Sequence, residues 1–423
     1  MLTLKYIAEN TEDVIRRLEK KHFDAREIVS QLIELDNQRK KTQLESDQAA
    51  AEINKLSKEI GTFIKQGKQA EVNALKDRTI KLKESIKSLE NQRNEIEKKL
   101  TALLVQLPNL PHESVPEGKG AEDNIIEQVG GKIPALPSDA LTHWELAKKY
   151  DLIDFELGVK ITGAGFPVYK GKGARLQRAL IDFFLDSARG DGYLEIQPPY
   201  LVNAASAFAT GQLPDKEDQM YYCPQDDLYL IPTAEVPVTN LYRGVILNES
   251  ELPIKNTAYS ACFRREAGSY GKDVRGLNRL HQFDKVEIVQ IQHPDKSYET
   301  LAEMVAYVES LVEKLELPWR TVRLCGGDMS FTSALTFDIE VFSAAQQRWL
   351  EVSSVSNFES YQANRLKCRF RATDKKIQLC HTLNGSALAL PRIVAALLEN
   401  NQTVDGIKIP AVLVPYTGFE MIY

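Results

Sequence analysis

Residues 262–287 read CFRREAGSYGKDVRGLNRLHQFDKVE, a pattern that predicts a strand, a long polar loop and a returning strand. Side chains two positions apart in a strand share a face. This alternation groups five side chains: Arg264 and Glu266 on the first strand, and Phe283, Lys285 and Glu287 on the second. A face so rich in charge is costly to bury unless a ligand or an ion-pair network compensates it. Arginine can bind a phosphate through paired hydrogen bonds and an aromatic ring can stack on a base, so a nucleotide site and a structural salt-bridge network both fit the pattern.

The chain around this hairpin alternates short apolar runs with helical segments. The runs include DLYLI, HQFDKVEIVQI and TFDIEVF, and one helical segment is LQRALIDFFLDSA. Short polar turns separate neighbouring runs in YYC-PQDD-LYLI and DIEVF-SAAQQR-WLEVSS. Strands joined by short turns pair antiparallel, so we predict an α+β domain with a mainly antiparallel sheet flanked by helices. The sequence has no GxGxxG or Walker loop, which excludes the usual α/β ways of binding a nucleotide.

An N-terminal arm is predicted from a second pattern. Apolar residues from position 28 to 63 recur at alternating steps of four and three, and the pattern resumes from 72 to 103. Three polar residues interrupt the seam: Arg39, Thr42 and Ser46. Between the two stretches lies GTFIKQGKQ, in which Gly61 and Gly67 are able to break a helix. This predicts an antiparallel coiled-coil hairpin, projecting roughly 50 Å at about 1.5 Å per residue.

A stretch rich in proline and glycine, LPNLPHESVPEGKGAEDN, follows the arm. Proline cannot continue a helix, so this stretch is predicted to be a linker. We therefore predict three parts: a helical domain with its arm at residues 1–107, a linker at 108–125, and a second domain at 126–423.

The formal net charge of −6 is unevenly distributed along the chain. Residues 1–107 hold 21 Lys and Arg against 18 Asp and Glu, which gives +3 and leaves −9 for the remainder. A mildly basic end allows a polyanionic partner. The outer faces of the arm carry nine basic residues: Lys55, Lys58, Lys65, Lys68, Lys76, Arg78, Lys81, Lys83 and Lys87. They form either a solubilising surface or a set of contacts to nucleic-acid phosphates.

The five cysteines are scattered and form no C-x-x-C pair, which predicts buried free thiols rather than a disulfide framework or a zinc site. Cys380 beside His381 could ligate a metal, but neighbours in a strand point in opposite directions. No apolar run is long enough to span a bilayer, and MLTLKYIAENTEDV at the start lacks a basic-then-apolar secretory pattern. We expect a cytoplasmic protein with no membrane partner.

The 262–287 stretch resembles motif 2 of class II aminoacyl-tRNA synthetases, in the form found in bacterial seryl-tRNA synthetases. Four more segments resemble elements of that family. GYLEIQPPYLV around Pro199 resembles the dimer-forming motif 1, and GSALALPRIVAALLEN with Arg392 resembles motif 3. IPTAEVP resembles the segment with the serine-pocket triplet, and EVSSVSNFESYQ resembles the ATP and metal segment. Each motif is short and degenerate. Five of them in family order behind a coiled-coil hairpin are specific, and the resemblance covers essentially the whole chain.

This resemblance implies a class II catalytic domain and a two-step reaction. Serine and ATP would form seryl-adenylate and pyrophosphate, and serine would then pass to the 3′-terminal adenosine of serine tRNA. The family also implies selenocysteine tRNA as a second acceptor, which the residues themselves leave open. A homodimer through motif 1 and a coiled coil that grips the long variable arm of serine tRNA follow from the same resemblance.

The family's ATP residues can be carried over one by one. Arg264 would hold the α-phosphate and Arg392 the far phosphates from the opposite side, and these two are the expected catalytic residues. Glu266 would recognise the adenine amino group, and Phe283 would stack on the ring. Six further residues are implied at the nucleotide: Arg265, Arg279, Glu351, Val352, Ser353 and Ser354. No nucleophilic side chain is needed, because positioning and electrostatic stabilisation carry the step.

The serine pocket and the metal follow from the same comparison. The implied serine residues are Thr233, Ala234, Glu235, Glu287, Asn384 and Ser386. Glu287 would pair with the ammonium group, and Glu235 and Ser386 are the best candidates to receive the hydroxyl. A site built to bind a hydroxyl rejects alanine, because its own polar groups are otherwise left unpaired. Glu351 and Ser354 would give oxygen ligands to Mg²⁺.

Several positions depart from the family pattern. Pro391 precedes the motif 3 arginine where glycine is common, and Gly165 and Asn364 stand where arginine is usual. Arg265 and Tyr270 occupy variable places in the motif 2 loop, which meets the tRNA acceptor end in the family. Two rival hypotheses remain: a class II paralogue that activates another small amino acid or does not charge tRNA, and a non-catalytic RNA-binding or coiled-coil protein.

Overall fold

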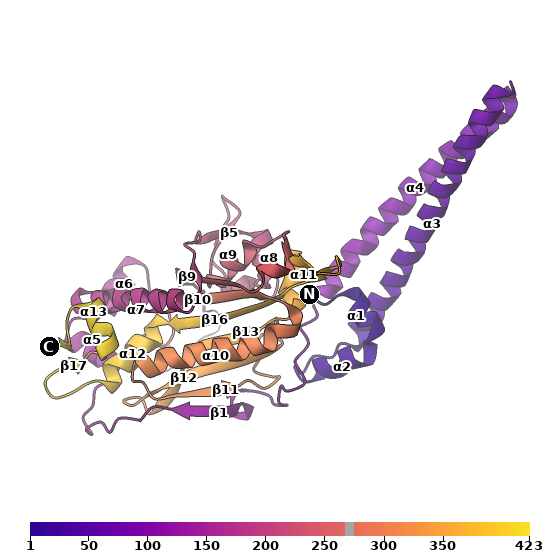
Figure 1. The fold of residues 1–423 in the computed structure, drawn as a ribbon. Coiled ribbons are helices and arrows are strands. Elements are labelled where there is room, and N and C mark those ends of the chain that lie inside the picture. Colours follow the sequence, from indigo (N-terminus) through magenta and orange to yellow (C-terminus); the bar gives the residue numbers. More distant parts are fainter. Residues whose placement is uncertain (267–274) are drawn as a thin grey trace. The chain divides into compact units, whose positions relative to one another are not determined.

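The computed structural model describes residues 1–266 and 275–423. The chain divides into two compact units. The first contains Met1–Glu19 and Phe23–Pro108, and the second contains Lys20–His22 and Asn109–Tyr423. Figure 1 shows the two units in the colours of the sequence.

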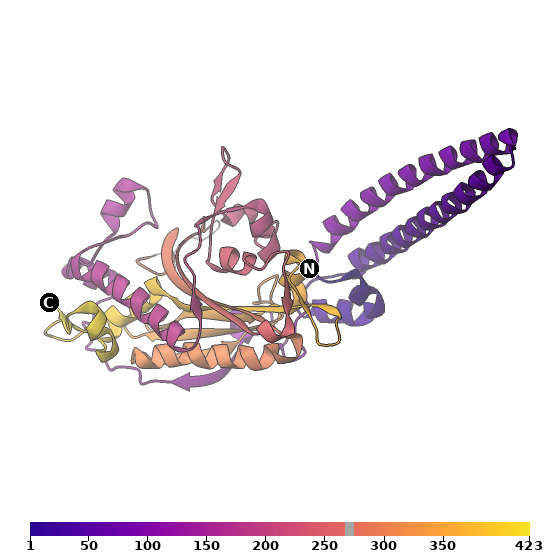
Figure 2. The same cartoon turned by 45° about the horizontal axis from the view of Figure 1, so that its top comes forward.

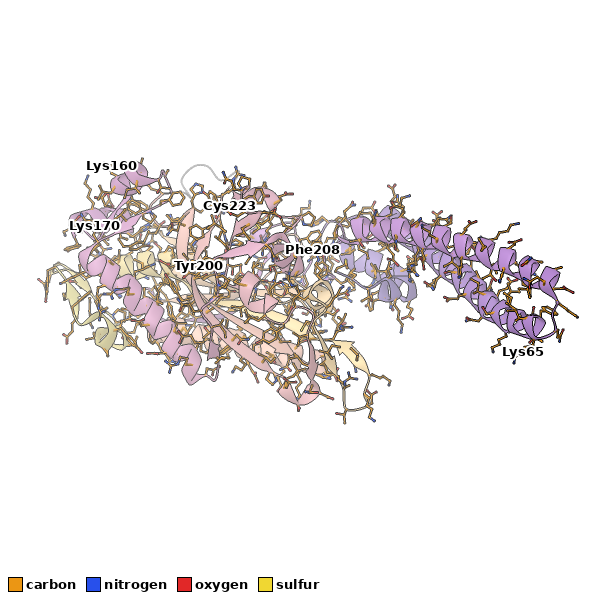
Figure 3. The ribbon with its side chains drawn as sticks, turned by 90° about the horizontal axis from the view of Figure 1, so that it is seen from above. Lys65, Lys160, Lys170, Tyr200, Phe208 and Cys223 are labelled. Atoms are coloured by element: carbon orange, nitrogen blue, oxygen red, sulfur yellow. The ribbon has the colours of Figure 1, made fainter. Side chains whose placement is uncertain are left out.

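The first unit is entirely helical in its secondary structure. Its helices are α1 (Leu4–Glu9), α2 (Thr11–Glu19), α3 (Arg26–Lys65) and α4 (Gln69–Leu104). The two long helices run side by side in opposite directions, which confirms the predicted coiled-coil hairpin (Figures 1 and 3). Gly61 lies inside α3 and does not break it. The chain reverses just beyond Lys65, where Gly67 has a φ of +72°, a value that glycine adopts without steric cost.

Polar contacts occur along the imperfect part of the seam. Asp36 is buried, and its carboxylate lies 2.7 Å from both Arg39 Nη2 and Lys40 Nζ. Burial alone would raise the pKa of Asp36, but the hydrogen bonds from Lys40 and Arg39 lower it. Farther along, Arg93 Nη1 of α4 donates to Gln43 Oε1 of α3 at 2.5 Å. The Arg93–Gln43 hydrogen bond therefore joins the two helices, whereas the ion pairs of Asp36 lie within α3.

The second unit is built on an eight-stranded sheet. The strands in sheet order are β1 (Ile125–Gly130), β11 (Trp319–Arg323), β12 (Leu335–Ser343), β13 (Arg348–Asn357), β16 (His381–Ala389), β10 (Gln282–Gln292), β9 (Ile254–Phe263) and β4 (Leu194–Glu195). All neighbouring pairs in it are antiparallel except β4 with β9. This confirms the predicted α+β class and the mainly antiparallel sheet.

Helices cover the sheet and enclose its apolar core. They are α5 (His143–Lys149), α6 (Phe155–Ile161), α7 (Gly171–Gly190), α8 (Ala204–Thr210), α9 (Glu235–Asn240), α10 (Ser297–Lys314), α11 (Ser360–Leu366), α12 (Leu390–Asn400) and α13 (Val414–Thr417). Figure 2 shows α10 lying along the sheet, where it packs on β13 and β16. Its buried stripe includes Leu301, Met304, Val308 and Leu311, which follow the helical period.

Smaller sheets complete this unit. Their strands are β2 (Ile153–Asp154), β3 (Val168–Tyr169), β5 (Leu201–Asn203), β6 (Tyr222–Cys223), β7 (Leu228–Leu230), β8 (Ile246–Asn248), β14 (Arg369–Arg371), β15 (Ile377–Leu379), β17 (Ile407–Lys408) and β18 (Met421–Ile422). The hairpins predicted from the polar turns are present, because β6 pairs with β7 and β12 pairs with β13, both antiparallel.

The predicted hairpin at 262–287 differs from the structure in one respect. Strand β9 ends at Phe263, so Arg264 and Glu266 lie beyond it rather than within it. The Arg264 N–H still bonds the His281 carbonyl at 2.9 Å, but Glu266 has a φ of +47°, outside the extended region. The backbone therefore turns away from the sheet where the sequence alternation continues.

The cysteines are free, and four of them are buried: Cys262, Cys325, Cys368 and Cys380. Cys223 is half-buried, so the prediction of buried thiols holds for four of the five. Among the helices of the described residues, none combines the length and the apolar character needed to cross a membrane.

The short segment Lys20–His22 belongs to the second unit through hydrogen bonds to backbone carbonyls. Lys20 Nζ donates to the carbonyls of Glu113 and Val115. Lys21 Nζ, which is buried, donates to the carbonyls of Ser330 (2.8 Å), Phe331 (3.2 Å) and Ser333 (2.8 Å). One ammonium group thus satisfies three carbonyls of a single loop.

Replacing Lys21 tests the importance of these bonds. Lys21→Met removes the three hydrogen bonds from Nζ and should lower the free energy of unfolding by about 1–3 kcal/mol, measured by urea denaturation. The exposed Lys376→Met is the matched control.

The same variant should change the pH dependence of stability. Burial lowers the pKa of Lys21 to about 7, against the opposing charge of Asp215. Between about pH 7 and 10 the unfolded chain keeps a proton that folded Lys21 has released, so stability contributed by this group rises with pH. Equal slopes of unfolding free energy against pH in wild type and Lys21→Met would contradict this account.

Candidate active site

A pocket of about 440 Å³ opens over β10, β13 and β16. Of the sixteen residues implied at the nucleotide and in the serine pocket, fourteen line it: Thr233, Glu235, Arg264, Glu266, Arg279, Phe283, Glu287, Glu351, Val352, Ser353, Ser354, Asn384, Ser386 and Arg392. Two others, Ala234 and Arg265, are not among the lining residues. Ala234 is fully buried, and the Arg265 N–H donates to the Gln219 carbonyl at 2.9 Å.

The register of the strands sets the floor of the pocket. Phe283, Lys285 and Glu287 alternate along β10 and all line the pocket. Glu287 lies opposite Ser386 of β16 in the antiparallel pairing. On its other side β16 pairs with β13, where Ser356 lies opposite Asn384. Residues from three strands are therefore brought to one surface by backbone pairing.

Arg264 approaches the pocket from the end of β9. Its guanidinium carbon lies 5.2 Å from the centre of the Phe283 ring, within range of a cation–π contact. Its Nε donates to the Pro232 carbonyl at 3.4 Å. The remaining guanidinium N–H groups are well suited to a bound anion, and the ring offers a flat apolar surface beside them.

Arg392 enters the same pocket from the first turn of α12. Pro391 precedes it in that first turn, where a backbone N–H has no helical partner, so the proline is tolerated. Arg392 Nε donates to the Asn278 carbonyl at 3.2 Å, and Nη1 donates to the Glu351 carbonyl at 2.5 Å. Two arginines far apart in the sequence thus line one cavity.

A third arginine is paired with a carboxylate. Arg279 Nη1 lies 2.9 Å from Glu266 Oε2, and both side chains line the pocket. Tyr270, singled out in the sequence, lies outside the described residues. The oxygen atoms of Glu266 remain suitable acceptors for an exocyclic amine.

Carboxylates gather beside Arg392. Glu351 is half exposed, and its Oε2 lies 3.5 Å from Arg392 Nη1. Asp338 lies opposite Ser354 in the pairing of β12 with β13, and its Oδ1 is buried without a hydrogen-bond partner. Burial and the nearby charge of Glu351 raise the pKa of Asp338 well above its usual range. The oxygen atoms of Glu351, Asp338 and Ser354 are hard donors of the kind that a divalent cation such as Mg²⁺ prefers.

Two buried carboxylates, Glu235 and Glu287, also line the pocket. Glu287 Oε2 is 2.5 Å from Lys285 Nζ and accepts a hydrogen bond from Thr233 Oγ1 at 3.2 Å. Glu235 accepts from Gln362 Nε2 at 2.6 Å. Burial raises the pKa of both glutamates, against the hydrogen bonds and positive charges around them. The two carboxylates suit a small molecule with an ammonium group.

Two pocket residues, Lys216 and Asn278, have no signal in the sequence pattern. Lys216 lies in an irregular segment, and Asn278 lies in the returning part of the 262–287 stretch. Gln362 has no such signal either; it does not line the pocket but reaches Glu235 from α11. Lys285 was detectable, because the period of two places it between Phe283 and Glu287.

The structure explains one of the two positions where the family usually has arginine, Gly165, and does not explain the other, Asn364. Gly165 has a φ of +83°, and a Cβ added there would lie 2.4 Å from His281 Cδ2. A larger residue such as arginine is therefore excluded unless the backbone shifts. Nothing in the structure explains Asn364.

Comparison with known families gives the class of the protein. Residues 221–401 match the tRNA synthetase class II core domain (G, H, P, S and T), and residues 1–111 match the seryl-tRNA synthetase N-terminal domain. Together with the antiparallel sheet and the pocket on it, these matches define a class II aminoacyl-tRNA synthetase.

Individual relatives narrow the assignment. The serine–tRNA ligase of Salinibacter ruber (strain DSM 13855 / M31) is 51% identical over 100% of this chain and 99% of that protein. The enzyme of Chlorobaculum parvum (strain DSM 263 / NCIMB 8327) is 48% identical over the whole of both. The solved structure of seryl-tRNA synthetase from Pyrococcus horikoshii complexed with ATP has a TM-score of 0.93 at 35% identity, covering 100% of this chain and 99% of that one. The chain belongs to the seryl-tRNA synthetases, the serine–tRNA ligases.

Proposed function

We propose that this pocket performs both steps of serine–tRNA ligation. ATP and L-serine bind side by side, and the serine carboxylate attacks the α-phosphate and displaces pyrophosphate. A hydroxyl of the 3′-terminal adenosine of tRNA then takes serine from seryl-adenylate and releases AMP. The observation that carries the proposal is that Arg264 and Arg392 line one cavity with the buried glutamates Glu235 and Glu287. Positive groups for phosphates and negative groups for an ammonium are therefore available within a single site.

The nucleotide occupies the end of the pocket with the arginines. Arg264 holds the α-phosphate, where negative charge grows during attack, and Arg392 holds the far phosphates. Phe283 offers its ring to the adenine and Glu266 accepts from the adenine amino group. Arg279 is already oriented by its ion pair with Glu266 and is a further phosphate contact. Fixed donors of this kind stabilise developing charge without reorganisation.

The backbone around the nucleotide completes that end of the site. Val352 and Ser353 lie on β13 between Glu351 and Ser354, and Ser353 Oγ donates to the Ser386 carbonyl at 2.5 Å, which joins the two strands. Arg265 follows Arg264 directly and is assigned to the rim of the ATP site. Glu351 and Ser354 would hold Mg²⁺, which when bound neutralises phosphate charge.

Serine occupies the end with the buried glutamates. Glu287 pairs with the α-ammonium group, while Glu235 and Ser386 receive the side-chain hydroxyl. Asn384 hydrogen-bonds Glu235 and helps to fix its orientation. Thr233 orients Glu287, and Ala234 lets α9 begin tightly against the sheet. Alanine would leave the hydroxyl acceptors unpaired and would bind weakly.

The first unit supplies the proposed tRNA contact. Its long hairpin carries exposed lysines, including Lys65 at the end of α3 (Figure 3). Lysines on this arm contact the phosphates of serine tRNA, and of selenocysteine tRNA as a second acceptor, in a salt-dependent manner. We assign residues 1–107 to tRNA binding, 108–125 to a linker and 126–423 to catalysis, in a cytoplasmic enzyme.

A homodimer through the motif 1 segment completes the proposal. Strand β4 lies at the edge of the sheet, and Leu194 within it is 63% exposed. Leu201, just beyond Pro199, is also exposed. An unpaired sheet edge with exposed leucines is well suited to pairing with a second copy of the chain.

Removing Arg264 tests the catalytic assignment. Arg264→Ala should lower kcat/KM for serine-dependent ATP–pyrophosphate exchange, because a well-placed donor to the transition state is lost. The lost transition-state stabilisation should be about 3–4 kcal/mol. Binding of serine tRNA should stay within about twofold of wild type. The exposed Arg371→Ala serves as control, and an Arg264→Ala variant that keeps its exchange activity would refute the assignment.

Shortening the arm should have the opposite effect. Deletion of residues 36–100 should spare pyrophosphate exchange but lower aminoacylation of serine tRNA by about a hundredfold or more at physiological salt, because phosphate contacts are lost. Unchanged aminoacylation would show that the arm does not bind tRNA.

The raised pKa of Glu287 predicts how serine binding depends on pH. An ammonium group is attracted by the ionised carboxylate and not by the protonated acid. Affinity for serine should therefore fall as pH falls, starting above the ordinary glutamate value of about 4.3. KM for serine, followed from about pH 8 to 5 by pyrophosphate exchange, should rise while Glu287→Gln shows a high and flat KM. A KM that stays constant over this range in wild type would contradict the role of Glu287.

A further inference from the structure

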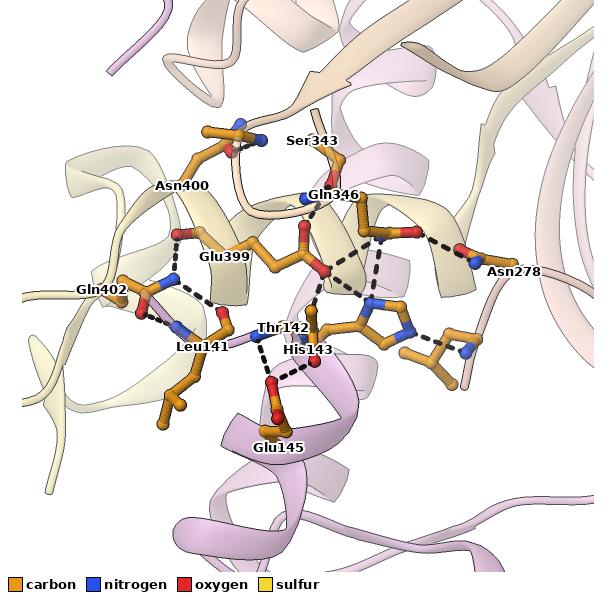
Figure 4. Close-up of polar contacts among 12 residues, drawn as sticks. Leu141, Thr142, His143, Glu145, Asn278, Ser343, Gln346, Glu399, Asn400 and Gln402 are labelled. Atoms are coloured by element: carbon orange, nitrogen blue, oxygen red, sulfur yellow. Dashed lines mark hydrogen bonds and ion pairs between the residues drawn. The ribbon is translucent and has the colours of Figure 1, made fainter. Parts of the chain in front are cut away.

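A buried histidine–glutamate pair lies in the second unit next to the pocket (Figure 4). His143 of α5 and Glu399 of α12 are both fully buried. His143 Nδ1 donates to Glu399 Oε1 at 2.7 Å, and the His143 backbone N–H donates to the same oxygen at 2.9 Å. Ser343 Oγ donates to the other oxygen. The carboxylate is therefore well satisfied, as a buried charge must be.

The second ring nitrogen of His143 faces a different segment. Nε2 accepts a hydrogen bond from the Leu277 N–H at 2.9 Å. An acceptor on one side and a donor on the other fix the proton on Nδ1, because a proton on Nε2 would face the Leu277 N–H. The ring thus acts as a rigid bridge from Glu399 to the backbone of residue 277.

A second branch of the network reaches the neighbouring residue. Gln346 Nε2 donates to Glu399 Oε1 at 3.0 Å, and Gln346 Oε1 accepts from Asn278 Nδ2 at 3.1 Å. The Asn278 carbonyl in turn accepts from Arg392 Nε at 3.2 Å. Leu277 and Asn278 both line the pocket. Both branches therefore end on the short backbone segment that orients Arg392.

Close packing joins this segment to the imidazole. Gly276 has a φ of +64°, and a Cβ added there would lie 2.2 Å from His143 Nε2. Glu399 also lies on the same helix as Arg392, about two turns farther along. The pair is thus connected to Arg392 through the helix and through the 276–278 segment.

We propose that His143, held by Glu399, is a positioning residue for ATP: it fixes residues 276–278 so that the Asn278 carbonyl orients Arg392 toward the phosphates. The inference rests on the proposed function, since it assumes that Arg392 binds ATP. A pair that served stability alone would not need to end, on both branches, at residues of the pocket. His143 itself does not touch the substrate.

Two substitutions of His143 distinguish the hydrogen bond to Glu399 from the hydrogen bond to Leu277. The amide of Gln reaches the position of Nε2 and can accept from Leu277, whereas the shorter amide of Asn can donate to Glu399 but cannot reach Leu277. His143→Asn should raise KM for ATP in pyrophosphate exchange about tenfold, with KM for serine changed less than about twofold. His143→Gln should restore KM for ATP to within about threefold of wild type.

Two further variants help to distinguish a specific effect on ATP binding from a general loss of folding. Gly276→Ala pushes the segment away while leaving the His143–Glu399 pair in place, and it should also raise KM for ATP selectively. His381→Asn removes a different, half-buried histidine, whose Nδ1 lies 2.8 Å from Ser297 Oγ outside the pocket, and should leave KM for ATP unchanged. Thermal unfolding of all four variants shows which of them fold.

The outcomes are distinct. Selective rises in KM for ATP in His143→Asn and Gly276→Ala, with rescue in His143→Gln, support the proposal. Equal effects of Asn and Gln at position 143, or a folded His143→Asn or Gly276→Ala with unchanged KM for ATP, overturn it. If wild type and His381→Asn show no serine-dependent exchange, the proposed function itself fails, and that result differs from a defect confined to the His143 variants.

Discussion

The cost of holding Glu235 and Glu287 away from water constrains the whole pocket. A buried ion without partners is unfavourable by about several kcal/mol, so each carboxylate must receive donors in good geometry. Lys285 and Thr233 meet Glu287, and Gln362 meets Glu235. These donors come from a strand, a loop and a helix that are far apart in the sequence. The carboxylates can stay buried only when all of these elements are correctly placed, and the same placement leaves a cage open to an ammonium group.

The register of β10 determines which of its side chains face the pocket and which face the apolar core. Along β10, Lys285 and Glu287 face the pocket, while Val286 and Ile288 between them are fully buried in the apolar core. A slip of one residue against β16 would exchange the two sets, burying charge in the core and exposing apolar groups in the pocket. The hydrophobic effect therefore fixes the register, and the register places Glu287 opposite Ser386.

This is why the sequence predicts some parts of the site and not others. Alternation along one strand is local, so Phe283, Lys285 and Glu287 could be assigned to one face from the residues alone. Beyond Phe263 the backbone leaves the extended region, and alternation no longer describes where Arg264 points. Lys216 and Gln362 come from segments with no matching period. Glu399 is the extreme case: it lies in the last turn of an apolar helix, a place typical of a solvated acid, yet it contacts His143, 256 positions away.

Buried polar groups in both units follow one logic. An apolar residue in place of a buried ion pair is often as stable or more so, so stability alone does not account for Asp36 in the coiled-coil seam or for His143 with Glu399. Hydrogen bonds, unlike apolar contacts, have direction. In the arm, Asp36 fixes Arg39 and Lys40 on one helix and so occupies a seam position that apolar packing leaves open. In the second unit, Glu399 orients the His143 ring by accepting from Nδ1, and the ring orients Leu277 by accepting from its backbone N–H. The next residue, Asn278, accepts a hydrogen bond from Arg392 through its carbonyl. Orientation of that arginine, rather than extra stability, is what such a pair adds to the fold.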